Sequence, residues 1–280
     1  MLTVFAVVLS VALHCVQQQA GSSNAARQVV TEAAEALDHK DNAKALASAD
    51  RAIALAPGDQ YAHLLRCRSL AGLRRHEQVV QACSESLRLK PNSAEALRDR
   101  GHYYLNLGRI EPGLADLLRA ESMTKADRGI YYHLGMAHYL RGDFAAAATA
   151  YEGCLRNSTD EGARTECQAW LYPSLVRAGR EAHARDLLRG ITSTSLPGHA
   201  GNYLDRLLLF SGARTERQVA ATMSAEGALS ETTVGYTLGL WHLLQGRSEQ
   251  ARPYFQRVLD TGYTTSWGYR AAASEMQRLR

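Results

Sequence analysis

Proline and lysine are scarce in this 280-residue sequence, which has 6 prolines. The lysines are Lys40, Lys44, Lys90 and Lys125. Because Ala and Leu dominate and β-branched residues are sparse, helix is the expected secondary structure. The arginines are scattered among Glu and Asp without a run of five, and the net charge is +4. Nucleic-acid binding requires basic residues clustered on one face, so we do not expect it.

Sequence signatures of catalysis and metal binding are also absent. There is no His-Glu-x-x-His, Cys-x-x-Cys, Gly-x-Ser-x-Gly, P-loop or dinucleotide fingerprint. Among the ten His, His133 and His138 are five residues apart, which places them on different faces of one helix. We therefore expect neither enzyme activity nor a metal ion or cofactor.

The first residues differ from the rest of the chain. Leu2 to Val16 is almost entirely apolar. This stretch is shorter than the ~20 residues of a membrane-spanning helix but fits the apolar region of a signal peptide. Ala20 to Ser22 offers a small-x-small cleavage pattern, although no Lys or Arg precedes the apolar stretch. We interpret residues 1–22 as a signal peptide or an N-terminal membrane anchor, with a buried helix as the alternative, and expect an exported chain.

Similar residues recur at intervals of 34. The pairs with this spacing are Pro57 and Pro91, Gly101 and Gly135, and Gly108 and Gly142, and the series Ala45, Val79, Gly113 and Ala147 repeats it. Such a period indicates stacked supersecondary units. We place turns near residues 40, 74, 108, 142, 179, 212 and 246, which divides residues 23–262 into seven helical hairpins.

The best copy of the repeat resembles the tetratricopeptide repeat family. That copy contains Tyr131, Leu134-Gly135, His138, Gly142-Asp143-Phe144, Ala147 and Tyr151, and a second contains Leu238-Gly239, His242, Gly246, Ala251 and Phe255. The resemblance covers roughly residues 25 to 262. It implies an all-α fold, a right-handed superhelical solenoid in which each hairpin buries its apolar face against its neighbours. Within each hairpin, a small residue on one helix admits an aromatic side chain from the other.

Two hairpins depart from this pattern, and one helix follows them. Pro173 lies inside an expected first helix and should kink that helix or delay its start. Gly201 to Phe210 lacks the Leu-Gly pair, so the fifth and sixth hairpins should be distorted. Ser266 is suited to capping a helix from Trp267 to Leu279, and we expect residues 263–280 to close the end of the last hairpin.

The resemblance also implies a partner-binding groove, because the residues after the aromatic and after the Leu-Gly pair face the concave side in this family. The corresponding residues are Leu64, Arg68, Arg98, His102, Asn106, Tyr132, Met136, Tyr139, Tyr236 and Leu240. Aromatic residues, Met and Arg are favoured at binding surfaces. Packing between repeats is the alternative for each residue. We expect the stripe of Tyr132, Met136 and Tyr139 to contribute to binding and not to stability.

These features favour a non-catalytic scaffold that binds a protein or peptide segment in its groove. The alternative is a regulatory subunit of an enzyme, or an enzyme with a pocket near residues 170–210. The stretch from Tyr236 to Leu279 resembles the ends of bacterial secreted tetratricopeptide proteins and lipoproteins. This resemblance implies a location in the bacterial envelope, periplasmic or membrane-attached.

Four cysteines follow the N-terminal segment, Cys67, Cys83, Cys154 and Cys167, and Cys15 lies within it. Cys67 and Cys83 are equally far from a turn near Arg75, so they face each other in an antiparallel hairpin. Cys154 and Cys167 flank the next loop between hairpins in a similar way. We predict two disulfides from these pairs, because a bridge requires Cα atoms roughly 4.4–6.8 Å apart. Buried thiols in a reducing compartment are the alternative.

Overall fold

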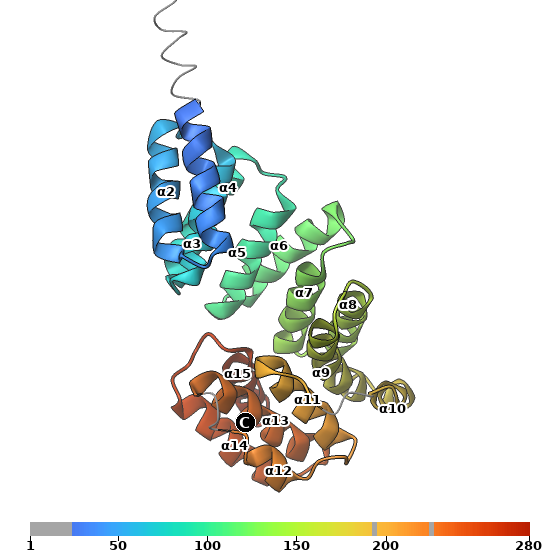
Figure 1. The fold of residues 1–280 in the computed structure, drawn as a ribbon. Coiled ribbons are helices and arrows are strands. Elements are labelled where there is room, and N and C mark those ends of the chain that lie inside the picture. The colour runs from blue at the N-terminus through green and yellow to red at the C-terminus, as the bar shows by residue number, and fades with distance from the viewer. Residues whose placement is uncertain (1–23, 192–194, 224–226) are drawn as a thin grey trace, which may run out of the picture. The chain divides into compact units, whose positions relative to one another are not determined.

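The computed structural model describes residues 24–191, 195–223 and 227–280. The expected signal peptide or anchor, residues 1–22, lies outside the described residues. Every regular element in these ranges is a helix, which confirms the all-α class (Figure 1). None of the described helices combines the length and apolar character needed to cross a bilayer.

Residues 24–38 form a helix that precedes α2. The helices that follow are α2 (Asn42–Leu55), α3 (Gln60–Gly72), α4 (His76–Leu89), α5 (Ala94–Asn106), α6 (Ile110–Met123), α7 (Arg128–Arg141), α8 (Phe144–Arg156), α9 (Glu161–Arg177), α10 (Glu181–Arg189), α11 (Gly198–Phe210), α12 (Glu216–Ala220), α13 (Ala228–Leu244), α14 (Ser248–Asp260) and α15 (Trp267–Arg278). They pair in chain order into hairpins, and α15 follows the last pair. The chain divides after Tyr103 into a first and a second compact unit, and α5 crosses the division.

The backbone turns sharply between the two helices of each hairpin. A residue with positive φ occurs at all seven expected turn positions: Lys40, Arg74, Gly108, Gly142, Gly179, Gly212 and Gly246. A left-handed residue ends a helix because its N–H bonds back to the last turn. The sequence locates these turns accurately because the geometry is local.

Glycines allow close approach of the two helices within a hairpin. A Cβ atom on Gly135 would lie 2.7 Å from the ring of Tyr151, and one on Gly239 would lie 2.5 Å from the ring of Phe255. Both rings are fully buried. This contact explains why the repeat pairs a small residue with an aromatic one sixteen positions later.

The fifth and sixth hairpins have short second helices, α10 with 9 residues and α12 with 5. Pro173 lies within α9, which begins at Glu161, so the proline does not delay the start of the helix. Proline has no N–H, so the carbonyl of Ala169 loses its usual partner four residues later. The guanidinium of Arg206 lies 3.5 Å from that carbonyl and donates to it.

The described part of the chain contains two disulfides, with the pairing expected from the sequence. Cys67 on α3 is bonded to Cys83 on α4, with a Cα–Cα distance of 5.3 Å. Cys154 on α8 is bonded to Cys167 on α9, with a Cα–Cα distance of 5.9 Å. The first bridge joins the two helices of one hairpin, and the second joins consecutive hairpins.

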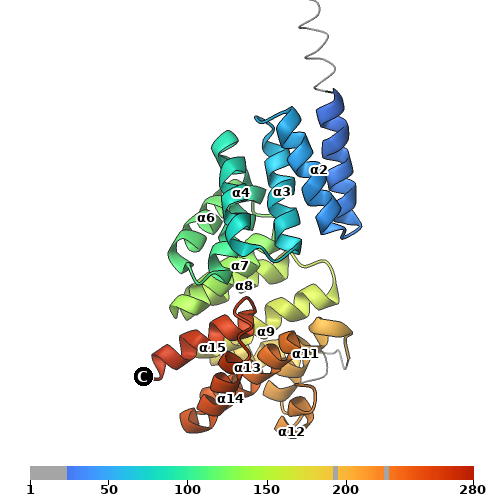
Figure 2. The ribbon, with the colours of Figure 1, turned by 90° about the vertical axis from the view of Figure 1, so that its left-hand side faces the viewer.

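Helix α15 packs against α13 and α14 and also contacts α7 (Figure 2). Ser266 caps it, as expected, by accepting a hydrogen bond from the N–H of Tyr269. Its buried face includes a charged residue. Glu275 is fully buried there, between the guanidinium groups of Arg177 and Arg278.

Candidate functional site

Most of the residues expected in the groove belong instead to the core. The buried ones are Leu64, Asn106, Tyr132, Met136, Tyr139, Tyr236 and Leu240, each with at most 7% of its surface exposed. The expectation that Tyr132, Met136 and Tyr139 lie on a binding surface is therefore wrong in this structure. Binding surfaces require side chains that a partner can reach, and these residues are enclosed by their own chain.

The physical reason is contact between first helices of different hairpins in the second unit. The hydroxyl groups of Tyr132 and Tyr203 lie 3.3 Å apart, which joins α7 to α11. Tyr236 on α13 donates a hydrogen bond of 2.8 Å to the hydroxyl of Tyr139 on α7. The stripe that we expected to face a partner therefore faces α11 and α13.

A buried arginine lies within this aromatic core. Arg206 has no exposed surface, and its guanidinium lies 4.5 Å from the ring centre of Trp170 and 5.4 Å from that of Tyr236. Its Nε donates a 2.9 Å hydrogen bond to the hydroxyl of Thr237. Aromatic faces and neutral oxygens thus surround this cation. No motif in the sequence predicts this arrangement.

Three expected groove residues, Arg68, Arg98 and His102, come together in the first unit with their side chains partly exposed. They border a pocket of about 300 Å³. Arg68 and Arg98 both bind Asp99, at 2.9 and 2.8 Å. Burial lowers the pKa of His102 to about 4, although Asp99 acts in the opposite direction. His102 is therefore neutral at pH 7.

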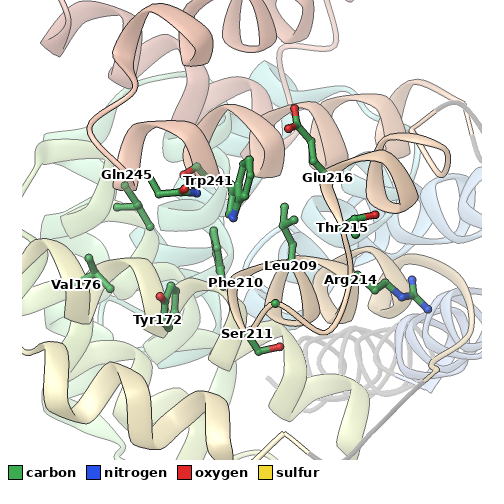
Figure 3. A pocket seen from close by; sticks show the side chains of 12 residues that line it. Tyr172, Val176, Leu209, Phe210, Ser211, Arg214, Thr215, Glu216, Trp241 and Gln245 are labelled. Atoms are coloured by element: carbon green, nitrogen blue, oxygen red, sulfur yellow. Dashed lines mark hydrogen bonds between the residues drawn. The ribbon is translucent and has the colours of Figure 1, made fainter.

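The second unit contains a pocket of about 570 Å³, which we name the aromatic pocket (Figure 3). It is lined by Tyr172, Val176, Leu209, Phe210, Ser211, Gly212, Arg214, Thr215, Glu216, Trp241, Leu244 and Gln245. These residues come from the carboxyl-terminal ends of α9, α11 and α13 and from the segment that leads into α12. The pocket overlaps the region near residues 170–210 that the sequence suggested as an alternative site.

Partly exposed aromatic rings form the walls of this pocket. Tyr172 and Phe210 stack with ring centres 4.7 Å apart. Trp241 points from α13 towards Phe210, and its ring is covered on one face by the guanidinium of Arg247 at 4.5 Å. All three rings remain partly open to solvent, unlike the enclosed rings of the core. Such rings provide contact area for a ligand at little entropic cost.

Glu216 supplies negative charge at the rim. Its Oε1 accepts a hydrogen bond of 2.7 Å from Tyr254 and one of 2.9 Å from His242. Burial raises the pKa of Glu216, but the hydrogen bonds from Tyr254 and His242 outweigh that effect and lower it. Glu216 is therefore ionised at neutral pH.

Arg214 is the charged residue of opposite sign in the lining. Its guanidinium forms an ion pair with Asp205, and Figure 3 shows the side chain extending away from the aromatic rings. Burial raises the pKa of Asp205, although Arg214 acts against that rise. The lining of the pocket thus combines aromatic surface with one carboxylate at the rim. Within the described ranges, no group of three or more His, Cys, Asp or Glu is arranged to bind a metal ion.

Part of the chain is similar to known repeat proteins. The family model described as tetratricopeptide repeat matches residues 98–162. Over 171 residues, the chain is 29% identical to the TPR repeat-containing thioredoxin TTL4 of Arabidopsis thaliana. That match covers 56% of this chain and 23% of the relative, so the chain spans about a quarter of the relative's length.

Two solved structures show a similar fold. PilW, described as a widely conserved type IV pilus biogenesis factor, aligns with a TM-score of 0.54 and 16% identity, over 84% of this chain and 92% of PilW. YrrB, described as a TPR protein with an unusual peptide-binding site, aligns with a TM-score of 0.51 and 15% identity, over 66% of this chain and 91% of YrrB. At such identities the likeness concerns the fold.

Proposed function

Because the repeats of this chain are of the tetratricopeptide type, we propose that it is a non-catalytic scaffold that binds a segment of another protein. The observation that carries this proposal is the aromatic pocket. Tyr172, Phe210 and Trp241 are partly exposed within a hollow, whereas most of the expected groove residues are enclosed. Binding hot spots are enriched in Trp and Tyr within concave, desolvated sites.

The pairing of the polar groups favours binding over catalysis. Glu216 already accepts hydrogen bonds from Tyr254 and His242, and Arg214 is paired with Asp205. A general acid or base acts on a substrate proton within hydrogen-bond reach, and a nucleophile requires an adjacent base. These groups instead fix the rim of the pocket, which suits recognition of a ligand.

The test is affinity capture from the native host with three forms of the protein. Wild type and Tyr61→Ala, an exposed aromatic of the first unit, should enrich the same partner. Trp241→Ala should lose it, since removal of a hot-spot side chain costs about 2 kcal/mol or more, roughly thirtyfold in affinity. Circular dichroism would check that the variant is folded. Equal capture by Trp241→Ala would contradict the proposal.

We propose a second contact on the first unit, where Arg68, Arg98 and His102 surround Asp99. Arg68 and Arg98 have 31% and 26% of their side chains exposed, so a partner can reach them. Arg98→Ala should weaken capture of the same partner less than Trp241→Ala, because rim contacts contribute less than buried aromatic anchors.

We further propose that the protein is exported, to a periplasmic or membrane-attached location. The two disulfides support this, because such bonds persist in oxidising compartments, and so does the apolar stretch Leu2 to Val16. Mass spectrometry of the protein from its native host, prepared without reductant, tests the proposal. Four free thiols on a chain that still begins at Met1 would refute it.

A further inference from the structure

Two arginines of α15 donate to carbonyl groups at the ends of first helices. Arg270 donates to the carbonyl of Asn106, the last residue of α5. Arg278 donates to the carbonyl of Tyr139 at 3.0 Å and to that of Leu140, in the last turn of α7. Such carbonyls lack a partner within their helix and carry the negative end of the helix dipole, so they attract a cation.

These acceptor carbonyls have a fixed place in the repeat. Asn106 lies two residues before the turn glycine Gly108, and Leu140 lies two residues before Gly142. The arginines also cover those glycines. A Cβ atom on Gly108 would lie 2.9 Å from the guanidinium of Arg270, and one on Gly142 would lie 3.3 Å from a side-chain nitrogen of Arg278.

The same positions in the sixth and seventh hairpins lie in the aromatic pocket. Phe210 precedes Gly212 by two residues, Leu244 precedes Gly246 by two, and Phe210 and Leu244 both line the pocket. Outside the helices, no backbone N–H of the described residues donates a hydrogen bond to either carbonyl. A Cβ atom on Gly212 or Gly246 would meet nothing within 4 Å in the described structure. The helix ends that α15 covers on α5 and α7 are thus uncovered on α11 and α13.

The surroundings of these uncovered ends also favour a cation. Glu216, which also lines the pocket, is ionised, and its two hydrogen bonds fix its position. Trp241 already stacks with the guanidinium of Arg247, which shows that this ring accepts an arginine. Tryptophan is the best aromatic partner for a cation, and the attraction strengthens as water is excluded. The one arginine of the lining, Arg214, is paired with Asp205.

We propose that the aromatic pocket binds an arginine side chain from a segment of a partner protein. In this inference, which rests on the proposed function, the guanidinium stacks on the aromatic wall beside Glu216 and donates to the carbonyls of Phe210 and Leu244. The partner reproduces at α11 and α13 the contact that α15 makes at α5 and α7. Arginine suits this site better than lysine, because its planar group can stack and donate several hydrogen bonds together.

A peptide with the sequence of residues 263–280 provides the probe, because this segment carries Arg270 and Arg278. Its twin has citrulline, a neutral isostere, in place of both arginines. The protein is labelled with ¹⁵N, and the indole N–H resonance of Trp241, assigned with Trp241→Phe, is followed during each titration. The unlabelled peptide leaves this signal free of interference from its own tryptophan.

We expect the arginine peptide to shift the Trp241 resonance saturably, with an affinity at least about fivefold above that of its citrulline twin. Glu216→Gln keeps an acceptor for Tyr254 and His242 while it removes the charge. This variant should bind the arginine peptide more weakly than wild type does and bind the citrulline peptide with unchanged affinity.

Equal affinities of the two peptides at Trp241 would overturn the preference for arginine and leave the proposed function intact. A shift confined to Trp267, with Trp241 unmoved, would overturn the inference by showing that the peptide replaces α15. Failure of the proposed function has a different signature, namely equal capture of the native partner by wild type and Trp241→Ala.

Discussion

Replacement of Tyr139 tests whether the expected groove is core. Tyr139 has no exposed surface, and its ring contacts Phe144 at 5.3 Å and Trp170 at 5.4 Å. Tyr139→Phe keeps these ring contacts and leaves the buried hydroxyl of Tyr236 without its acceptor. An unpaired buried polar group costs about 1–3 kcal/mol. Tyr139→Ala also opens a cavity, which for an aromatic residue costs about 3–5 kcal/mol.

The free energy of unfolding is measured with urea. Tryptophan fluorescence reports the second unit, because all three tryptophans, Trp170, Trp241 and Trp267, belong to it. Single domains have a free energy of unfolding of about 5–15 kcal/mol. Tyr139→Ala should therefore leave this unit with a small free energy of unfolding or unfold it. The control is Tyr61→Ala, at a tyrosine with 42% of its surface exposed, which should change stability by less than about 0.5 kcal/mol.

The opposite result would support the original expectation that Tyr139 faces a binding groove. If Tyr139→Ala unfolds at the urea concentration of wild type and loses partner binding instead, Tyr139 lies on a surface, and the contacts of α7 with α11 and α13 are wrong. If Tyr139→Ala loses stability and Tyr139→Phe does not, the ring of Tyr139 is buried but the hydrogen bond to Tyr236 is refuted.

Three further outcomes follow from the structure. Replacement of both Cys67 and Cys83 by serine should lower the stability of the first unit by about 3 kcal/mol, because the bridge closes a short loop. Chemical denaturation with and without reductant measures this loss. If reductant still lowers the stability of the variant, the effect belongs to the other bridge. Gly239→Ala should cost about 1–3 kcal/mol in urea unfolding, since the new methyl meets the Phe255 ring, and an unchanged midpoint would contradict that contact. The pKa of His102 is lowered from 6.5 to about 4 by burial, so the folded state binds fewer protons than the unfolded state between these values. Stability should therefore fall as pH decreases from 6.5 to 4, less so in His102→Gln, and identical pH profiles would refute the lowered pKa of His102.

The features that the sequence predicts well are local. A turn residue and the helix before it lie within a few positions, so Gly142 and Gly246 indicate helix ends without knowledge of the rest of the fold. The pairing of Cys67 with Cys83 follows from their equal distance from one turn, which requires only an antiparallel hairpin. The 34-residue period carries the same kind of information, because it compares each hairpin with its neighbour.

The positions of the groove residues depend on contacts that this period does not contain. Tyr132 meets Tyr203 across 71 residues, and Tyr139 meets Tyr236 across 97, so each pair joins hairpins that are not adjacent in the chain. Burial of Arg206 likewise requires α9, α11 and α13 together. A repeat pattern states which residues share a face, and the packing of distant hairpins decides whether that face is covered.

The aromatic pocket is a candidate site that the repeat pattern does not predict. Tyr172, Phe210 and Trp241 precede their turn glycines by seven, two and five residues, so no common register connects them. The pocket borders the sixth hairpin, whose second helix has 5 residues where α14 has 13. Departure from the repeat therefore coincides with exposed aromatic surface and uncovered helix ends. Binding in the aromatic pocket should therefore depend on the irregular sixth hairpin, whose short second helix the regular seventh hairpin does not reproduce.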